Sequence, residues 1–117
     1  MSSRESAQEL ARFIWLSEDE GLQRSVRRVK ASLRGRVKSG HYMRSMAAGA
    51  WMRVADLASK ICANKMKEGT DDGAPYEEAA SKGKFAHARR TRVLCSAMLA
   101  EHFDKHLQQV EQEASNE

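Results

Sequence analysis

The chain has 117 residues, of which 31% are charged and 6% aromatic, and its formal net charge is +4 at pH 7. This length suits one domain with a modest core, and a composition dominated by alanine and charged residues, with a single proline, favours helices over strands. No apolar run approaches the ~20 residues that a membrane span needs, so we expect no membrane partner.

The first expected helix begins after Ser2 and ends near Leu16. Ser2 and Glu5 have the spacing of a capping box, in which the hydroxyl and the carboxylate each accept a hydrogen bond from an otherwise unpaired backbone amide. Phe13 and Trp15 flank the apolar face of this helix. Its inward positions are Ala7, Leu10, Ala11 and Ile14.

The second expected helix begins at a second candidate capping box, Ser17 with Glu20, and runs to about Lys38, with Gly40 ending it. Its apolar residues recur every three or four positions, which places them on one stripe of a helix. That stripe is Leu22, Val26, Val29, Leu33 and Val37. The opposite face carries Arg24, Arg27, Arg28, Arg34 and Lys38.

The positive charge is segregated along the chain. Residues 24–65 contain eleven lysines and arginines and a single acid, Asp56, which gives this segment a net charge of +10. The other acids lie towards the two ends and in the loop that follows. Such segregation indicates an anionic partner, either a nucleic-acid backbone or an acidic protein surface.

The third expected helix runs from about Met43 to Lys67 and forms a hairpin with the second about Gly40. We expect Asp56 to pair with Arg53 or Lys60, one turn away on the same helix. Small residues at 47–50 would allow another helix to approach closely, with a tryptophan beside them. The inward positions are Ala47, Ala50, Trp51, Val54, Ala58, Ile61, Cys62 and Met66.

Residues 68–83 contain three of the seven glycines and the only proline, and are expected to form a loop. The final helix is expected from Phe85 to about Val110, as part of one domain over residues 1–113 with a frayed tail at 114–117. Its inward positions are Phe85, Ala88, Cys95, Leu99, Phe103 and Leu107. We expect Cys62 and Cys95 to be reduced core thiols, with a disulfide between helices as the alternative.

The basic face of the second helix is the candidate binding surface. Lysines and arginines bind phosphates through counterion release without reading the base sequence, so we expect nucleic acid, DNA or RNA, as the partner. The bases of the final helix extend this surface if that helix packs beside the second. The candidate residues are Arg24, Arg27, Arg28, Lys30, Arg34, Lys38, Lys84, Arg89, Arg90 and Arg92.

The alternative partner is an acidic host protein docked on the same face. Aromatic and arginine side chains dominate the binding energy of protein interfaces, and Trp15, Tyr42 and Arg44 are the candidates for such contacts. A homodimer is compatible with either partner. A helix–turn–helix about Gly40 would place Tyr42 and Arg44 at the start of a recognition helix, but both flanking helices are longer than in that motif.

The sequence offers little for catalysis, metals or cofactors. There is no glycine-rich phosphate loop or nucleophile elbow, and we expect a protein that is not an enzyme and has no cofactor. His102 and His106 have the spacing of metal ligands on one helix face. No further cysteine or histidine cluster accompanies them, and His106 falls on the apolar side of the helix. We therefore expect His106 to be a hydrogen-bonded core or rim histidine, and we expect no metal site.

Residues 33–60, LRGRVKSGHYMRSMAAGAWMRVADLASK, resemble a segment of short helical proteins encoded by tailed bacteriophages. The matching positions are Lys38, Gly40, Tyr42, Ala47, Trp51, Ala55 and Ala58, together with Arg89 or Arg90 on the final helix. Met43 departs from the pattern, in which an aspartate caps the third helix. The resemblance implies a phage or prophage origin and no particular activity.

These observations together predict an all-α fold of four helices in a compact bundle. The N-terminus, with Glu5 and Glu9, lacks the pattern of a secretory signal. We therefore expect a cytoplasmic protein, located in the host cytoplasm if it is encoded by a phage.

Overall fold

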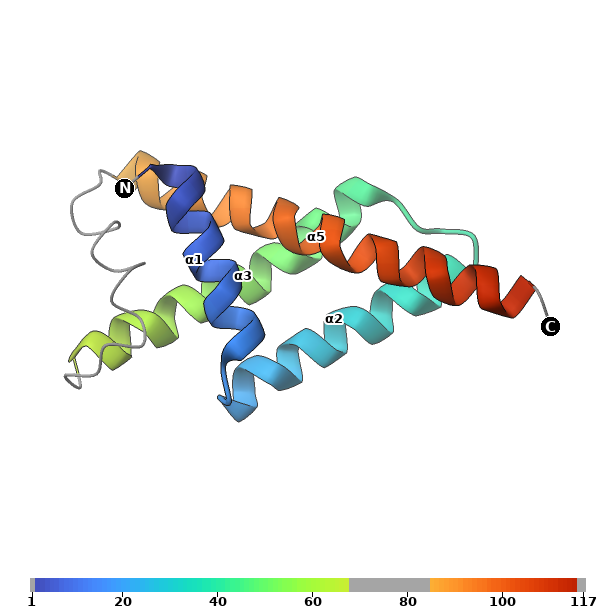
Figure 1. Ribbon diagram of the computed structural model, residues 1–117, viewed down its shortest axis with the longest axis horizontal. Helices are drawn as coiled ribbons and strands as arrows, with labels where there is room; N and C mark the ends of the chain where they lie inside the picture. The colour runs from blue at the N-terminus through green and yellow to red at the C-terminus, as the bar shows by residue number, and fades with distance from the viewer. Residues whose placement is uncertain (1, 68–84, 116–117) are drawn as a thin grey trace.

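The computed structural model describes residues 2–67 and 85–115, and within them the side chains of residues 2–64 and 88–105. These residues form the helices α1 (Ser3–Leu16), α2 (Glu20–Lys38), α3 (Arg44–Lys67) and α5 (Phe85–Ser115) and contain no strand (Figure 1). The prediction of an all-α bundle of four helices is confirmed. The predicted loop at 68–83 and residues 116–117 of the predicted tail lie outside the described residues.

The helices form a flattened body with extents of 50 × 27 × 17 Å. α5 packs mainly on α3 and α1, whereas α2 packs mainly on α3 and meets α5 less extensively. Figure 1 shows α3 and α5 crossing near the middle of the molecule, with α1 lying across them and α2 on the side towards the C-terminus of α5. Within the described residues, no helix is both long and apolar enough to cross a membrane.

The core forms where α1, α3 and α5 meet. Trp51 is fully buried, and its indole stacks on the Phe103 ring with centroids 4.6 Å apart and planes 15° from parallel. Fully buried alanines on α3 let the neighbouring helices approach closely, as the small residues of this helix predict. The core contributed by α1, α3 and α5 is Ala7, Leu10, Ala11, Ile14, Ala47, Trp51, Val54, Ala55, Ala58, Cys62, Cys95, Leu99, Ala100 and Phe103.

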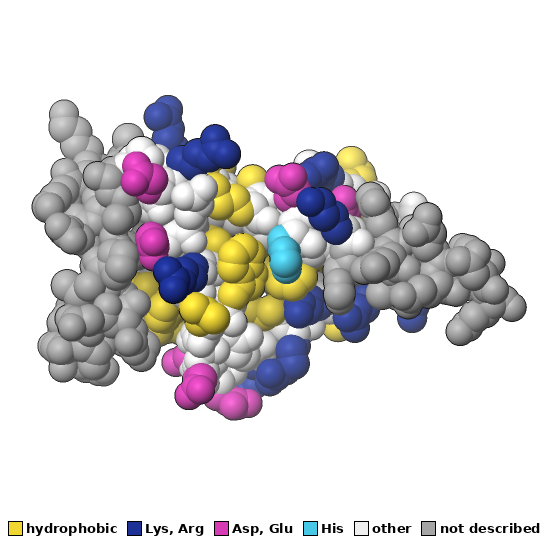
Figure 2. All heavy atoms as spheres, viewed as in Figure 1, with side chains coloured by type: hydrophobic (Ala, Val, Ile, Leu, Met, Phe, Trp, Pro, Cys, Tyr) yellow, Lys and Arg dark blue, Asp and Glu magenta, His cyan; other side chains and the backbone are white. Residues whose placement is uncertain are grey.

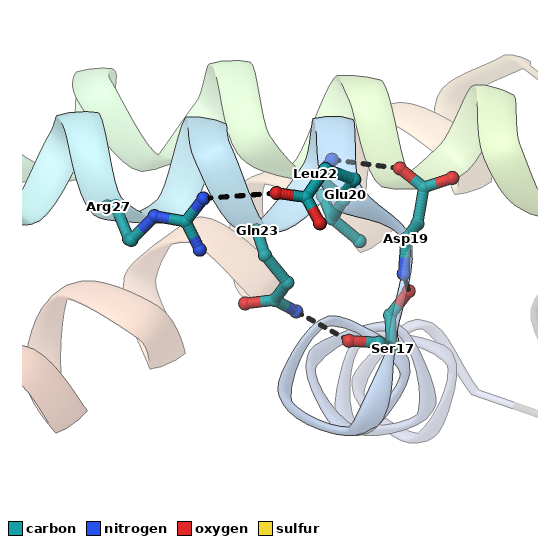
Figure 3. A network of polar contacts seen from close by, with 6 residues as sticks. All are labelled: Ser17, Asp19, Glu20, Leu22, Gln23 and Arg27. Carbon is teal, nitrogen blue, oxygen red and sulfur yellow. Dashed lines mark hydrogen bonds and ion pairs between the residues drawn. The ribbon is translucent and has the colours of Figure 1, made fainter.

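The corner between α1 and α2 corrects one prediction. Asp19, and not Ser17, caps α2: its carboxylate accepts a hydrogen bond from the Leu22 amide at 2.9 Å (Figure 3). The Ser17 hydroxyl instead accepts from the Asp19 amide at 3.1 Å. Three acids follow Ser17, so two capping positions competed, and aspartate at the later one caps the helix directly. The box predicted at Ser2 and Glu5 is confirmed.

The turn after α2 sets the hairpin with α3. Gly40 has a φ of +77°, a left-handed conformation that favours glycine. The amides of Gly40 and His41 donate to the carbonyls of Val37 and Arg36 at 3.2 and 2.8 Å, which is the hydrogen-bond pattern of a Schellman motif. The predicted hairpin about Gly40 is therefore confirmed, and it fixes the direction in which the outer face of α2 points.

Candidate nucleic-acid interface

The outer face of α2 presents five bases to solvent. Its apolar stripe is turned towards α3 and α5, with Leu22, Val26 and Leu33 buried. The residues on the far side are exposed, and they span about 21 Å along the axis at 1.5 Å per residue. We name this surface the α2 basic face; it consists of Arg24, Arg27, Arg28, Arg34 and Lys38.

The charges of the α2 basic face are largely uncompensated. No acid occurs between Glu20 and Asp56 in the sequence. Arg27 lies 3.6 Å from the Glu20 carboxylate, but both side chains are mostly exposed, so the pair is worth at most about 1 kcal/mol. Among the described residues, no acid forms an ion pair with Arg24, Arg28 or Arg34. These guanidinium groups are therefore available to an anionic ligand.

Lys30 occupies a different position from the other bases of α2. Its side chain is partly buried, and its amine lies 4.5 Å from the centroid of the Phe103 ring on α5. This is within the range of a cation–π contact. Lys30 therefore borders the α2 basic face on the side where α2 meets α5. Because its amine contacts Phe103, it is less available to a ligand than the other bases of α2.

The bases of α5 do not continue the α2 basic face. α2 meets α5 at Phe103, which lies thirteen residues, or about 20 Å, beyond Arg90 along the helix. Arg89 and Arg90 are exposed near the other end of α5. That end of the helix lies away from α2 in Figure 1. Lys84 lies outside the described residues.

Arg92 makes a contact within the fold. Its guanidinium group lies 2.9 Å from the Asp56 carboxylate of α3, and a quarter of its side-chain surface is exposed. The prediction that Asp56 pairs with Arg53 or Lys60 on its own helix is thus wrong. A cross-helix partner is nearer because α5 packs along α3. Arg92 consequently links these two helices and is less available to a ligand than Arg89 and Arg90.

The three residues predicted for a protein partner differ in exposure. Trp15 is 47% exposed at the end of α1. Tyr42 is half-buried, and its hydroxyl donates a hydrogen bond of 2.7 Å to the Asp104 carboxylate of α5. Arg44 is exposed at the first residue of α3. Trp15 is therefore the aromatic side chain of this group that is accessible to a partner.

His102 is the residue whose role the sequence did not reveal. Its ring centroid lies 5.1 Å from that of Trp15 and 5.0 Å from that of Phe103. His102 thus joins the exposed tryptophan to the core ring of Phe103, although its own side chain is exposed. The side chain of His106, the predicted core or rim histidine, lies outside the described residues. The one feature of the sequence that could have indicated this contact is Trp15, an aromatic residue beside the apolar face of α1. Its partner, His102, is 87 positions away in sequence, so local spacing does not pair them.

Hydrophobic side chains gather at the centre of the face shown in Figure 2, with a histidine beside them. Lysine and arginine side chains line the border where α2 lies. The exposed apolar side chains at the end of α1 are Trp15, 47% exposed, and Leu16, 68% exposed. This part of the molecule thus combines accessible apolar surface with positive charge.

No family model, curated protein or solved structure matches this chain. Its function is therefore inferred from its own residues and their geometry.

Proposed function

We propose that this chain is a small non-enzymatic protein, of bacteriophage type, that binds nucleic acid through the α2 basic face. The observation that carries the proposal is the exposure of five bases on one side of a single helix, with no acid among them. The resemblance of residues 33–60 to phage-encoded helical proteins supports the assignment of origin.

Binding of this kind derives its affinity from phosphates. Each base that neutralises a phosphate releases condensed counterions, and the gain depends on salt concentration and only weakly on base sequence. The guanidinium group of arginine also matches phosphate geometry with two parallel donors, and four of the five residues are arginines. The α2 basic face is therefore better suited to the repeated phosphates of a nucleic-acid backbone than to a single anion.

An acidic host protein is the second candidate partner. The exposed Trp15 and Leu16 favour it, because protein interfaces are centred on accessible aromatic and apolar side chains with a charged rim. Such a partner would bind at a fixed stoichiometry, whereas the number of protein molecules bound to a nucleic acid would increase with the length of that nucleic acid. The stoichiometry of binding thus separates the two candidates.

The test is fluorescence anisotropy with a labelled duplex and a labelled single strand of equal length. The variant R27A/R28A/R34A removes three bases from the α2 basic face. The matched control R4A/R12A/R53A removes three exposed bases from α1 and α3 and gives the same net charge. We expect the first variant to lose affinity for all base sequences alike and the control to lose much less.

Equal losses in the two triple variants would show that only net charge matters and that α2 is not the binding surface. Unchanged affinity in R27A/R28A/R34A would remove the proposal. Circular dichroism of both variants verifies that the helices remain folded, as expected for substitutions at exposed helix positions.

A further inference from the structure

The exposed indole of Trp15 is connected to Lys30 of α2 through a row of ring contacts. His102 lies against Trp15 and also meets Phe103 edge to face, with the two rings 84° apart. At the other end of this row, the amine of Lys30 lies over the Phe103 ring, 4.5 Å from its centroid. The indole and Lys30 are therefore joined by side-chain contacts that pass through the buried ring of Phe103.

A second contact fixes the same side of α2 to the end of α1. The side-chain amide of Gln23 donates hydrogen bonds of 2.9 Å to the carbonyls of Ile14 and Ser17, on either side of Trp15 in sequence. Arg27 and Lys30 lie four and seven residues after Gln23, on the same side of the helix. Figure 3 shows Arg27 one turn along α2 from Gln23. Arg27 and Lys30 thus lie on the side of α2 that contacts the end of α1.

The acids near this corner give the surface a direction. Glu18 and Glu20 are exposed at the start of α2, and Figure 2 shows acidic side chains at that end of the helix. A phosphate chain that passes Trp15 is repelled there and attracted along α2 towards Arg34 and Lys38. The charge pattern therefore fits an extended anion that has an aromatic group to place on the indole.

We propose that Trp15 is a stacking platform for an unpaired base, and that the protein binds single-stranded nucleic acid in preference to duplex. This inference rests on the proposed function and names its substrate class. A single strand can place a base on an exposed aromatic ring while its phosphates follow a basic groove or face. A duplex must first unpair and unstack that base, which costs binding free energy.

The arrangement separates two tasks. The α2 basic face holds phosphates and provides most of the salt-dependent attraction, whereas Trp15 contacts a base and provides the preference for single strands. Stacking on an aromatic side chain does not depend on which base is present, so little sequence preference is expected. His102 supports the indole from the side of α5 and acts as a positioning residue.

The test compares W15A, W15Y and L16A with the unchanged protein in anisotropy titrations of a single strand and of a duplex. L16A is the matched control, because Leu16 is the neighbouring residue and is 68% exposed. We expect W15A to weaken single-strand binding roughly 5- to 100-fold, the effect of losing one stacked base, with a much smaller loss on duplex. W15Y should retain most of the affinity, and L16A should bind as the unchanged protein does.

Tryptophan fluorescence gives a second readout. The chain has two tryptophans, and Trp51 is fully buried. A stacked base should therefore quench the emission of Trp15, and the quenching should disappear in W15Y although that variant still binds. Quenching that persists in W15Y would contradict the inference, because it would not arise at Trp15.

The outcomes separate this inference from the proposed function. If the single strand and the duplex both bind in a salt-dependent way, and W15A leaves the two affinities unchanged or weakens them equally, the stacking platform is overturned while the α2 basic face stands. If neither the single strand nor the duplex binds, the stacking platform and the proposed function are both overturned. Tight binding of poly-L-glutamate that W15A abolishes, with nucleic acid bound no better than this polypeptide, would overturn both in favour of an acidic protein partner.

Discussion

The ring of Phe103 lies against the indole of Trp51 on one side and the amine of Lys30 on another, at 4.6 and 4.5 Å from its centroid. Three helices therefore meet at one side chain: α5 through Phe103 itself, α3 through the tryptophan and α2 through the lysine. The indole N–H of Trp51 has no hydrogen-bond acceptor among the described residues. Burial of the two rings has to outweigh the cost of that unpaired donor.

Replacing Phe103 with alanine should strongly destabilise the protein. We expect F103A to lower the free energy of unfolding by about 3–5 kcal/mol, because it removes the stack and leaves a cavity beside Trp51. V93A on the same helix, at a side chain that is 45% exposed, should change it by less than about 1 kcal/mol. Urea unfolding followed by circular dichroism measures both. Similar losses in the two variants would show that Phe103 does not anchor the bundle.

The cap of α2 can be tested by two single substitutions. D19A removes the carboxylate that accepts from the Leu22 amide and should cost about 1 kcal/mol of unfolding free energy. S17A leaves that hydrogen bond in place and should cost less. The Ser17 hydroxyl accepts from the backbone amide of Asp19, which precedes the first residue of α2. Thermal unfolding of the two variants compares them. A larger loss in S17A would restore Ser17 as the principal cap.

Stability should fall at alkaline pH. Burial raises the pKa of the Cys95 thiol from 9.0 to about 12, and burial, with a hydrogen bond to Asp104, raises the pKa of Tyr42 from 10.0 to about 12. The unfolded chain releases these protons at lower pH than the folded chain does. The stability is therefore complete below pH 9 and decreases as the pH rises from about 9 towards 12.

The thiol contribution can be isolated by substitution. Cys95 should account for at most about 1.4 kcal/mol of lost stability per pH unit within this range. C95A removes the titrating group, so its unfolding free energy should depend less steeply on pH between about 9 and 10 than that of the unchanged protein. Urea unfolding at a series of pH values provides the comparison. Identical slopes would show that the thiol titrates alike in both states.

Glu20 opposes the binding surface that we propose. Its carboxylate lies 3.6 Å from Arg27, so E20Q should free that guanidinium group and raise nucleic-acid affinity about 2- to 5-fold at low salt. The same change should cost up to about 1 kcal/mol of stability, because an acid in the first turn interacts favourably with the helix dipole. E9Q makes the same charge change on α1 and is the control. An equal gain in E9Q would attribute the effect to net charge.

The four helices and most of their inward residues were predictable from local patterns. The spacing of Leu22, Val26 and Leu33 defines the buried side of α2, and Gly40 marks the turn because a left-handed residue is needed there. Such patterns depend on residues within one or two turns of each other. They therefore also predict the exposure of the α2 basic face, which lies opposite the buried stripe.

The contacts between helices were not predictable in the same way. Asp56 has bases one turn away on both sides, yet it pairs with Arg92 because α5 packs beside α3. Local spacing likewise places Lys30 with its basic neighbours, whereas the packing of α2 on α5 sets its amine over Phe103. Neither the pairing of Trp15 with His102 nor the distance between the two groups of bases follows from the sequence alone.

The most direct test of nucleic-acid binding by the α2 basic face is the salt dependence of duplex affinity in the unchanged protein and in R27A/R28A/R34A. We expect submicromolar binding at low salt with a linear log–log slope, and a slope reduced by about 2.7 in the variant if all three arginines contact phosphates. Equal slopes would contradict the assignment to these arginines. Affinity weaker than about 10⁻⁴ M at physiological salt would contradict nucleic-acid binding itself.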